Sequence, residues 1–147
     1  RGNCMKIVVK KPNPDPPYSL HDAHILKLRL DGETLHLVTQ YGYVQTSAPF
    51  VQVEGDVEIT GVDAESSCVY VMEYPQVPCG NYGVFTGRKM PLEAFLQEFS
   101  EATLEILDET YGYWMAKLDG FLDLSDRLLE CSLELCYTGE FRYLLKD

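Results

Sequence analysis

The stretch His24–Thr39, HILKLRLDGETLHLVT, decides the fold that we expect for this chain. Two runs of alternating apolar and polar residues flank Asp31-Gly32, a pair that suits a two-residue hairpin turn of type I′ with positive φ at both positions. Folding about this turn pairs Leu28 with Leu35 and predicts one buried face, because side chains alternate along a strand. That face comprises His24, Leu26, Leu28, Leu30, Leu35, Leu37 and Thr39.

Short alternating segments continue the β pattern on both sides of this hairpin. We expect further strands at residues 5–10, 42–46, 56–60, 68–74, 82–86, 103–110, 113–118, 128–137 and 141–145. Residues 103–110 also keep a helical period, so an extension of the preceding helix is the alternative there. A turn is expected over 120–126. Thr138-Gly139 predicts a tight turn that joins the last two strands in a second hairpin.

One segment has a clear helical period. Pro91 suits the first helical turn, and acidic residues occupy the side opposite the apolar one. The apolar side contains Leu92, Phe95, Leu96 and Phe99. The predicted fold class is therefore α+β: a mostly antiparallel sheet of meanders and hairpins, covered in part by one amphipathic helix near residues 91–102.

Length and composition limit the classes of protein that the chain can belong to. Its 147 residues, 46% of them hydrophobic, predict a single domain over 1–147. Met5 begins the first strand-like run, so Arg1–Cys4 are left outside the expected fold. The chain contains no run of about 18 apolar residues, which a membrane span would need, and no recognisable secretion signal. We therefore expect a cytoplasmic protein.

The charge is strongly acidic and unevenly distributed. The net charge is −11, which argues against a nucleic-acid-binding surface because phosphate neutralisation requires clustered cations. Residues 1–46 contain six Lys or Arg and four Asp or Glu, whereas residues 47–147 contain six and nineteen. This asymmetry suits either an acidic binding face or general solubility.

Cysteine and histidine spacing predicts no metal centre. The five cysteines include no C-x-x-C pair and are an odd number, which favours reduced thiols packed in the core. His21-Asp22-Ala23-His24 is the one His/Asp cluster, but residues three apart on a strand point to opposite faces. We expect Asp22 to close a turn and His24 to be a partly buried core histidine. We expect no metal and no cofactor.

No recognisable catalytic arrangement is present. The chain lacks a G-x-S-x-G elbow, a Walker loop and a dinucleotide-binding glycine motif. No cysteine lies in a recognisable elbow or at a helix N-terminus that would lower the pKa of its thiol, and Cys68 and Cys131 lie in apolar runs. Acidic neighbours are abundant, but a glycosidase needs two carboxyl groups placed across a cleft. We therefore expect a protein that is not an enzyme.

The aromatic run Tyr111-Gly112-Tyr113-Trp114 lies between acidic residues and is the candidate binding site. Exposed aromatic rings beside carboxylates are typical of an interface that receives a basic partner. The alternative is that Trp114 packs in the core and the rings form a cross-strand pair. The candidate binding residues are Asp108, Glu109, Tyr111, Tyr113, Trp114 and Asp119.

The chain resembles a group of small bacterial proteins of unknown function that have an LHDxxI start and a YGY…G…YxGxxxY end. The matching segments here are Leu20–Ile25, Leu104–Tyr113, Gly120 and Leu133–Tyr143. Thr110 stands where the group has an aromatic residue. Some proteins of this group are similar to immunity proteins that neutralise a toxin, so the resemblance implies a role in binding another protein.

These observations predict a non-catalytic, acidic binding protein, of the immunity type, that inhibits a basic protein partner. The alternative hypothesis is a small-molecule-binding β module with an aromatic-lined pocket between helix and sheet. The third hypothesis is a small hydrolase. A deep apolar pocket would favour the alternative, whereas a flat, acidic surface with central aromatic rings would favour the binding protein. The oligomeric state is open.

Overall fold

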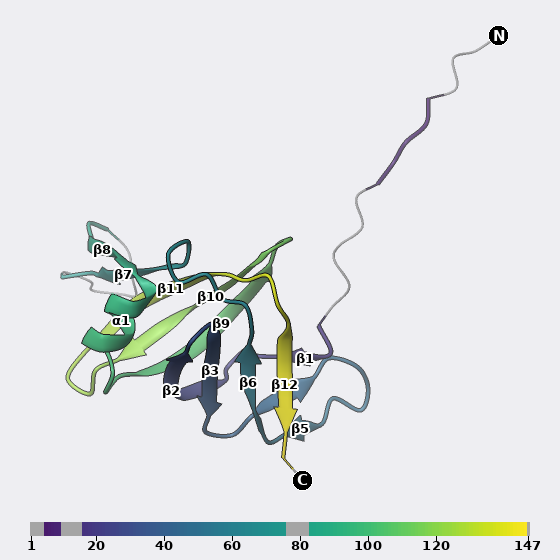
Figure 1. Ribbon diagram of the computed structural model, residues 1–147, viewed down its shortest axis with the longest axis horizontal. Helices are drawn as coiled ribbons and strands as arrows, with labels where there is room; N and C mark the ends of the chain where they lie inside the picture. The colour runs from purple at the N-terminus through teal and green to yellow at the C-terminus, as the bar shows by residue number, and fades with distance from the viewer. Residues whose placement is uncertain (1–4, 10–15, 76–82, 147) are drawn as a thin grey trace.

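The computed structural model describes residues 5–9, 16–75 and 83–146. Most of this part of the chain forms one nine-stranded antiparallel sheet with the order β12-β6-β3-β2-β9-β10-β11-β7-β8 (Figure 1). Its strands are β2 (His24–Asp31), β3 (Thr34–Thr39), β6 (Gly55–Ile59), β7 (Cys68–Glu73), β8 (Thr86–Pro91), β9 (Thr103–Tyr111), β10 (Met115–Asp123), β11 (Leu128–Cys136) and β12 (Phe141–Leu145).

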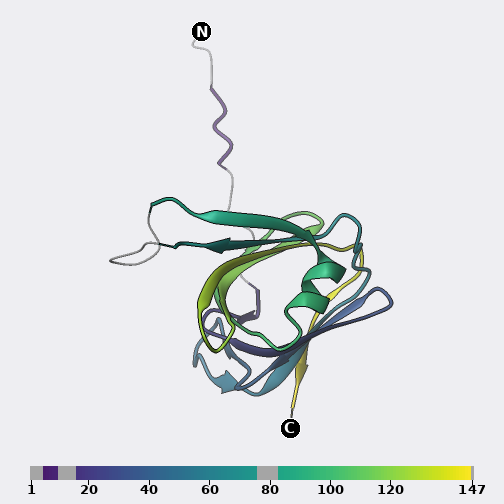
Figure 2. The same cartoon turned by 90° about the vertical axis from the view of Figure 1, so that its left-hand side faces the viewer.

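A small sheet and one helix complete the described part. The small sheet has the order β1-β4-β5 and consists of β1 (Tyr18–Ser19), β4 (Tyr43–Gln45) and β5 (Gln52–Val53). The helix α1 (Leu92–Glu98) lies inside the curl of the large sheet, against β8, β2 and β7 (Figure 2). The predicted class, a mostly antiparallel sheet with one helix, is confirmed. The one helix in the described residues, α1, has seven residues, which is too short to span a bilayer.

The first hairpin forms where the sequence predicts it, but its register differs. Leu28 pairs with Leu37, and Asp31 pairs with Thr34, so that Gly32 and Glu33 form the turn. Gly32 has φ +60° and Glu33 has no positive φ, which suits a type II′ turn with glycine at its first central position. The turn is therefore displaced by one residue from the predicted Asp31-Gly32.

A β-bulge at Leu26 changes the predicted face of β2. Ile25 pairs with Thr39 and Lys27 with Val38, which leaves Leu26 without an opposite residue. The alternation is inverted at this point, so Ile25 is buried whereas Leu26 is 45% exposed. His24 is exposed as well, and the prediction that it lies in the core is wrong.

The helix is shorter than predicted. Leu92 and Phe95 are buried as expected, and Pro91 precedes the first turn as the last residue of β8. The helix ends at Glu98, and the amide of Ala102 donates to the carbonyl of Phe99 in the turn that follows. This early end leads directly into β9, so residues 103–110 are a strand and not a helical extension.

The C-terminal hairpin prediction is wrong because β11 has no free edge. β10 and β7 flank β11 on its two sides, so the last strand must pair elsewhere. After Tyr137 the chain turns towards Thr60 and Gly61, where the amides of Thr138 and Gly139 donate to their carbonyls. β12 then pairs with β6 at the edge of the sheet.

Three other local predictions fail. Residues 5–9 are exposed and form no strand, and Lys10 lies outside the described residues. The strand expected at 82–86 begins only at Thr86, and Tyr82 is outside the described residues too. The turn expected over 120–126 starts later, because β10 continues through Gly120 to Asp123.

Candidate functional site

The six residues of the predicted site divide between the two faces of the sheet. The register of β9 against β10 shifts next to Gly120: Ile106 pairs with Gly120, whereas Asp108 pairs with Asp119, so Leu107 is an extra residue. A β-carbon at Gly120 would lie 1.8 Å from the carbonyl oxygen of Glu105, so this close approach requires glycine. Beyond this bulge Asp108 faces outwards.

Glu109 and Tyr111 face inwards and stabilise the fold. Glu109 Oε2 accepts a hydrogen bond from the Leu20 amide at 2.6 Å, and Glu109 Oε1 accepts one from the Tyr111 hydroxyl at 2.9 Å. The Tyr111 ring contacts Phe141 edge-on, with centroids 5.5 Å apart. Burial is the main cause that raises the pKa of Tyr111. These two predicted site residues are therefore turned away from the outer surface.

The LHD segment near the start of the chain holds the bulge of β9 in place. His21 Nδ1–H donates to the Leu107 carbonyl at 2.5 Å, and the Asp22 amide donates to the Ile106 carbonyl at 2.7 Å. Asp22 has φ +65°, as expected of a residue that closes a turn. The hydrogen bond to Leu107, followed by the charge of Asp22, raises the pKa of His21.

The outer face of β9, β10 and β11 is strongly acidic. In the register of these strands and β7, three rows of neighbouring residues share this face: Glu105–Phe121–Glu130–Met72, Asp108–Asp119–Ser132–Tyr70 and Thr110–Lys117–Glu134–Cys68. We name the charged members, Glu105, Asp108, Lys117, Asp119, Glu130 and Glu134, the acidic outer face. Because α1 lies inside the curl, it does not cover this face (Figure 2).

At the centre of the acidic outer face two carboxylates oppose each other. Asp108 and Asp119 are direct cross-strand partners, an arrangement of like charges that destabilises a sheet. Lys117 approaches Asp119 at 3.9 Å, which is the one ion pair between described residues of this face. Ser132, the other neighbour of Asp119, is 7% exposed, and its Oγ has no hydrogen-bond partner within the described part of the chain.

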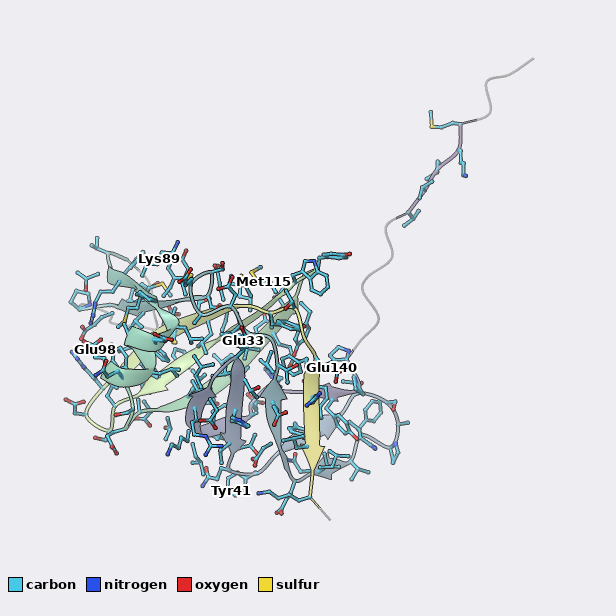
Figure 3. All side chains as sticks on the ribbon, viewed as in Figure 1. Glu33, Tyr41, Lys89, Glu98, Met115 and Glu140 are labelled. Carbon is cyan, nitrogen blue, oxygen red and sulfur yellow. The ribbon has the colours of Figure 1, made fainter. Side chains whose placement is uncertain are left out.

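The exposed aromatic rings lie at the end of the β9–β10 hairpin. Tyr113 is 89% exposed and Trp114 is 53% exposed, and the two rings contact each other edge-on with centroids 4.9 Å apart. The Trp114 carbonyl accepts a hydrogen bond from the Tyr137 amide, which holds the backbone of the tip against the end of β11. Figure 3 places Met115, the next residue, at the end of this hairpin, far from α1. Trp114 is therefore a surface residue.

Three acidic residues of this face were missed by the sequence analysis. Glu105, Glu130 and Glu134 are far apart in the chain, and the register of three strands is needed to place them together. One signal was available: Cys131, Leu133 and Leu135 alternate with polar residues in the predicted strand 128–137, so Glu130 and Glu134 have to point away from that apolar side.

An open groove is lined by the loop around His21 and by β4 and β5. It has a volume of about 650 Å³, and its wall includes His21, Asp22, His24, Tyr41 and Glu54. His21 Nε2 lies 3.4 Å from Asp22 Oδ2. No group of three or more His, Cys, Asp or Glu side chains in the described residues is arranged to hold a metal ion.

Side chains fill the space between the helix and the sheet, where the small-molecule-binding hypothesis expects a ligand pocket. The cavity between α1 and β2, lined by Ile25, Phe95 and Leu104 among others, has a volume of about 20 Å³. A pocket for a drug-sized ligand is typically at least about 300 Å³. This particular space therefore has no room for such a ligand.

The three described cysteines are free thiols. Cys131 is buried, and burial raises its pKa to about 12, so its thiolate form is scarce at neutral pH. Burial also raises the pKa of Cys68. Neither environment activates a nucleophile. Cys4 and Cys79 lie outside the described residues.

Comparison with known proteins adds no relative: no family model, no curated protein and no solved structure matches the chain.

Proposed function

We propose that this protein binds a basic protein partner through the acidic outer face and the exposed rings of Tyr113 and Trp114. The observation that carries the proposal is the opposed pair Asp108 and Asp119 in a face with one internal lysine. Like charges across a strand pair cost stability in the free protein, and a cation from a partner would relieve that repulsion.

The aromatic tip adds the anchor that a charged surface lacks. Trp and Tyr are enriched among the residues that contribute most to binding energy at protein interfaces. Trp114 immediately precedes β10, and Asp119 follows it by five positions, which is about 17 Å in an extended chain. A surface of this length suits a protein partner better than a small ligand.

We further propose that the protein acts as an immunity-type inhibitor in the cytoplasm of a bacterial cell. The resemblance described above supports this role, and so does the absence of a recognisable catalytic arrangement in the sequence. In such a role the acidic outer face would cover a basic functional surface of a toxin. The natural partner would then be a basic protein encoded beside the gene for this chain.

The test is binding to the products of the adjacent genes, measured by biolayer interferometry over a range of salt concentrations. The test variant carries Asp108→Lys, Asp119→Lys and Glu134→Lys. The matched control carries Glu54→Lys, Glu65→Lys and Glu101→Lys. Both variants have the same net charge, so they differ only in where the charges lie.

We expect a basic gene product to bind, with an association rate that falls as salt rises. The test variant should lower that rate on the order of tenfold, and the control variant should change it little. Trp114→Ala should increase the dissociation rate, whereas Phe50→Ala, which removes a similarly exposed ring elsewhere, should not. Equal effects of the two charge variants, or the lack of any basic partner among the adjacent products, would refute the proposal.

A further inference from the structure

A strand-forming segment of the chain has no strand partner. Met5–Val9 reads MKIVV, with β-branched residues at three consecutive positions, and such residues favour strands. In the structure the segment lies away from the curled sheet (Figure 1), and its apolar side chains are 75–84% exposed. Apolar side chains of this kind usually become buried when a partner is present.

The sequence around this segment carries the opposite charge to the rest of the protein. Residues 1–14 contain four Lys or Arg and no Asp or Glu, whereas residues 15–147 contain eight and twenty-three. Electrostatic attraction therefore favours contact between this segment and an acidic surface of the same kind of chain. Lys6 lies within the segment itself, and Lys10 and Lys11 follow it.

Of the two edges of the large sheet, β12 is the one that suits an added strand. The other edge, β8, carries Arg88, Lys89 and Pro91, and cations and proline protect a strand from further pairing. Arg88 and Lys89 would also repel a basic segment. On β12, Arg142 is already paired with Glu58 and Glu140, at 3.0 and 2.9 Å.

The hydrogen bonds of β12 determine which of its backbone groups remain available. Glu140 accepts from the Thr60 amide, and Lys146 donates to the Glu54 carbonyl, so even-numbered residues bond to β6. By the alternation of an antiparallel pair, Phe141, Tyr143 and Leu145 direct their amides and carbonyls to the free edge. Leu144 and Leu145 are also exposed there.

We propose that Met5–Val9 adds as a β-strand to the free edge of β12 in a second copy of this chain, so that two copies exchange these segments. Four prolines lie between Val9 and Tyr18, and proline favours an extended chain without turning back. The segment therefore reaches a neighbouring molecule more readily than its own β12. Reciprocal exchange uses the same two surfaces on each copy and closes as a two-fold dimer.

The test is the mass of the full chain in solution, measured by analytical ultracentrifugation from micromolar to sub-millimolar concentration. Ile7→Pro removes an amide from the exposed segment and should leave the folded sheet intact, because Ile7 is 76% exposed and lies outside the strands. Leu145→Pro removes an amide that points to the free edge, where proline is tolerated. Val84→Pro, in another exposed segment outside the strands, is the matched control.

We expect the wild type and the Val84→Pro variant to reach twice the 16.7 kDa chain mass, and each of the other two variants to stay at the single mass. A mixture of Ile7→Pro and Leu145→Pro chains should recover a dimer, because one chain keeps the segment and the other keeps the edge. Three results would overturn the proposal: a monomeric wild type, a dimer that survives Ile7→Pro, or a dimer that survives Leu145→Pro. If the wild type is a monomer, protection of its Met5–Val9 amides from hydrogen exchange would show that the segment pairs within its own chain.

Discussion

Replacement of Ser132 by alanine should stabilise this protein, although it removes a buried side-chain oxygen. Ser132 is 7% exposed, and its Oγ has no hydrogen-bond partner among the described residues. A buried hydroxyl that loses its bonds to water without replacement costs about 1–3 kcal/mol. Alanine avoids that cost, and the small void left by one oxygen atom offsets part of the gain. We therefore expect a net gain of about 1 kcal/mol in the free energy of unfolding.

This gain corresponds to a measurable change in melting temperature. Unfolding entropy is about 2.1 cal/mol/K per residue, so a chain of 147 residues should gain roughly 3 °C from 1 kcal/mol. Differential scanning calorimetry and urea unfolding both measure the effect. The matched control is Ser67→Ala. Ser67 is also buried, at 1% exposed, but its Oγ accepts a hydrogen bond from the Cys136 amide at 2.9 Å.

The two serine variants should change stability in opposite directions. Ser67→Ala leaves the Cys136 amide without its partner and should cost about 1–3 kcal/mol. The strand propensities of serine and alanine are both low, so propensity does not determine the sign at Ser132. A Ser132→Ala variant that melts below the wild type would show that the hydroxyl has a partner, and it would refute the reasoning.

Three further outcomes can be measured on the same preparation. Gly32→Val should cost about 1 kcal/mol or more in urea unfolding, because φ at Gly32 is +60° and a β-branched residue resists this conformation. No atom lies within 4 Å of the new β-carbon, so the cost comes from the backbone and not from a clash. Gly112→Ala, where the β-carbon would make only ordinary contacts, should cost little. His21 should titrate above 6.5 by NMR, because the hydrogen bond to Leu107 and the charge of Asp22 raise its pKa. Protonation of His21 then stabilises the fold, so His21→Gln should lose more stability below pH 6.5 than above the raised pKa, and an equal loss at both would contradict the raised pKa. Trp114 fluorescence should be strongly quenched by acrylamide, and a shielded, blue-shifted emission would remove this ring from the proposed interface.

Local patterns were sufficient to predict the fold class and much of the core. The alternation in 128–137 placed Cys131, Leu133 and Leu135 on the buried face, and all three are buried. Leu92 and Phe95 also lie inside as their helical spacing predicts. These predictions hold because each depends on the periodicity of a single strand or helix, which neighbouring residues define. The exposed position of Trp114 did not follow from such a pattern, since a turn residue has no periodic face.

The composition of the candidate site depended on contacts between distant segments. The sequence indicated the hairpin that carries Asp108, Asp119, Tyr113 and Trp114. Only the bulge at Leu107 turned Glu109 inwards, where it binds the amide of Leu20 across 89 positions of sequence. Glu105, Glu130 and Glu134 joined the face through pairing of three strands.

The partner of the last strand shows the same division between local and tertiary information. Thr138-Gly139 correctly marks a change of direction, but a turn does not specify the strand that receives the chain. β7 and β10 already use both edges of β11, so β12 cannot pair there and pairs instead with β6, at an edge of the sheet. The sequence by itself indicated most of the strands, and it indicated the apolar side of those strands that no bulge interrupts. Tertiary structure decided the bulges and the strand order, because unpaired backbone groups must find hydrogen-bond partners wherever the assembled sheet still offers them.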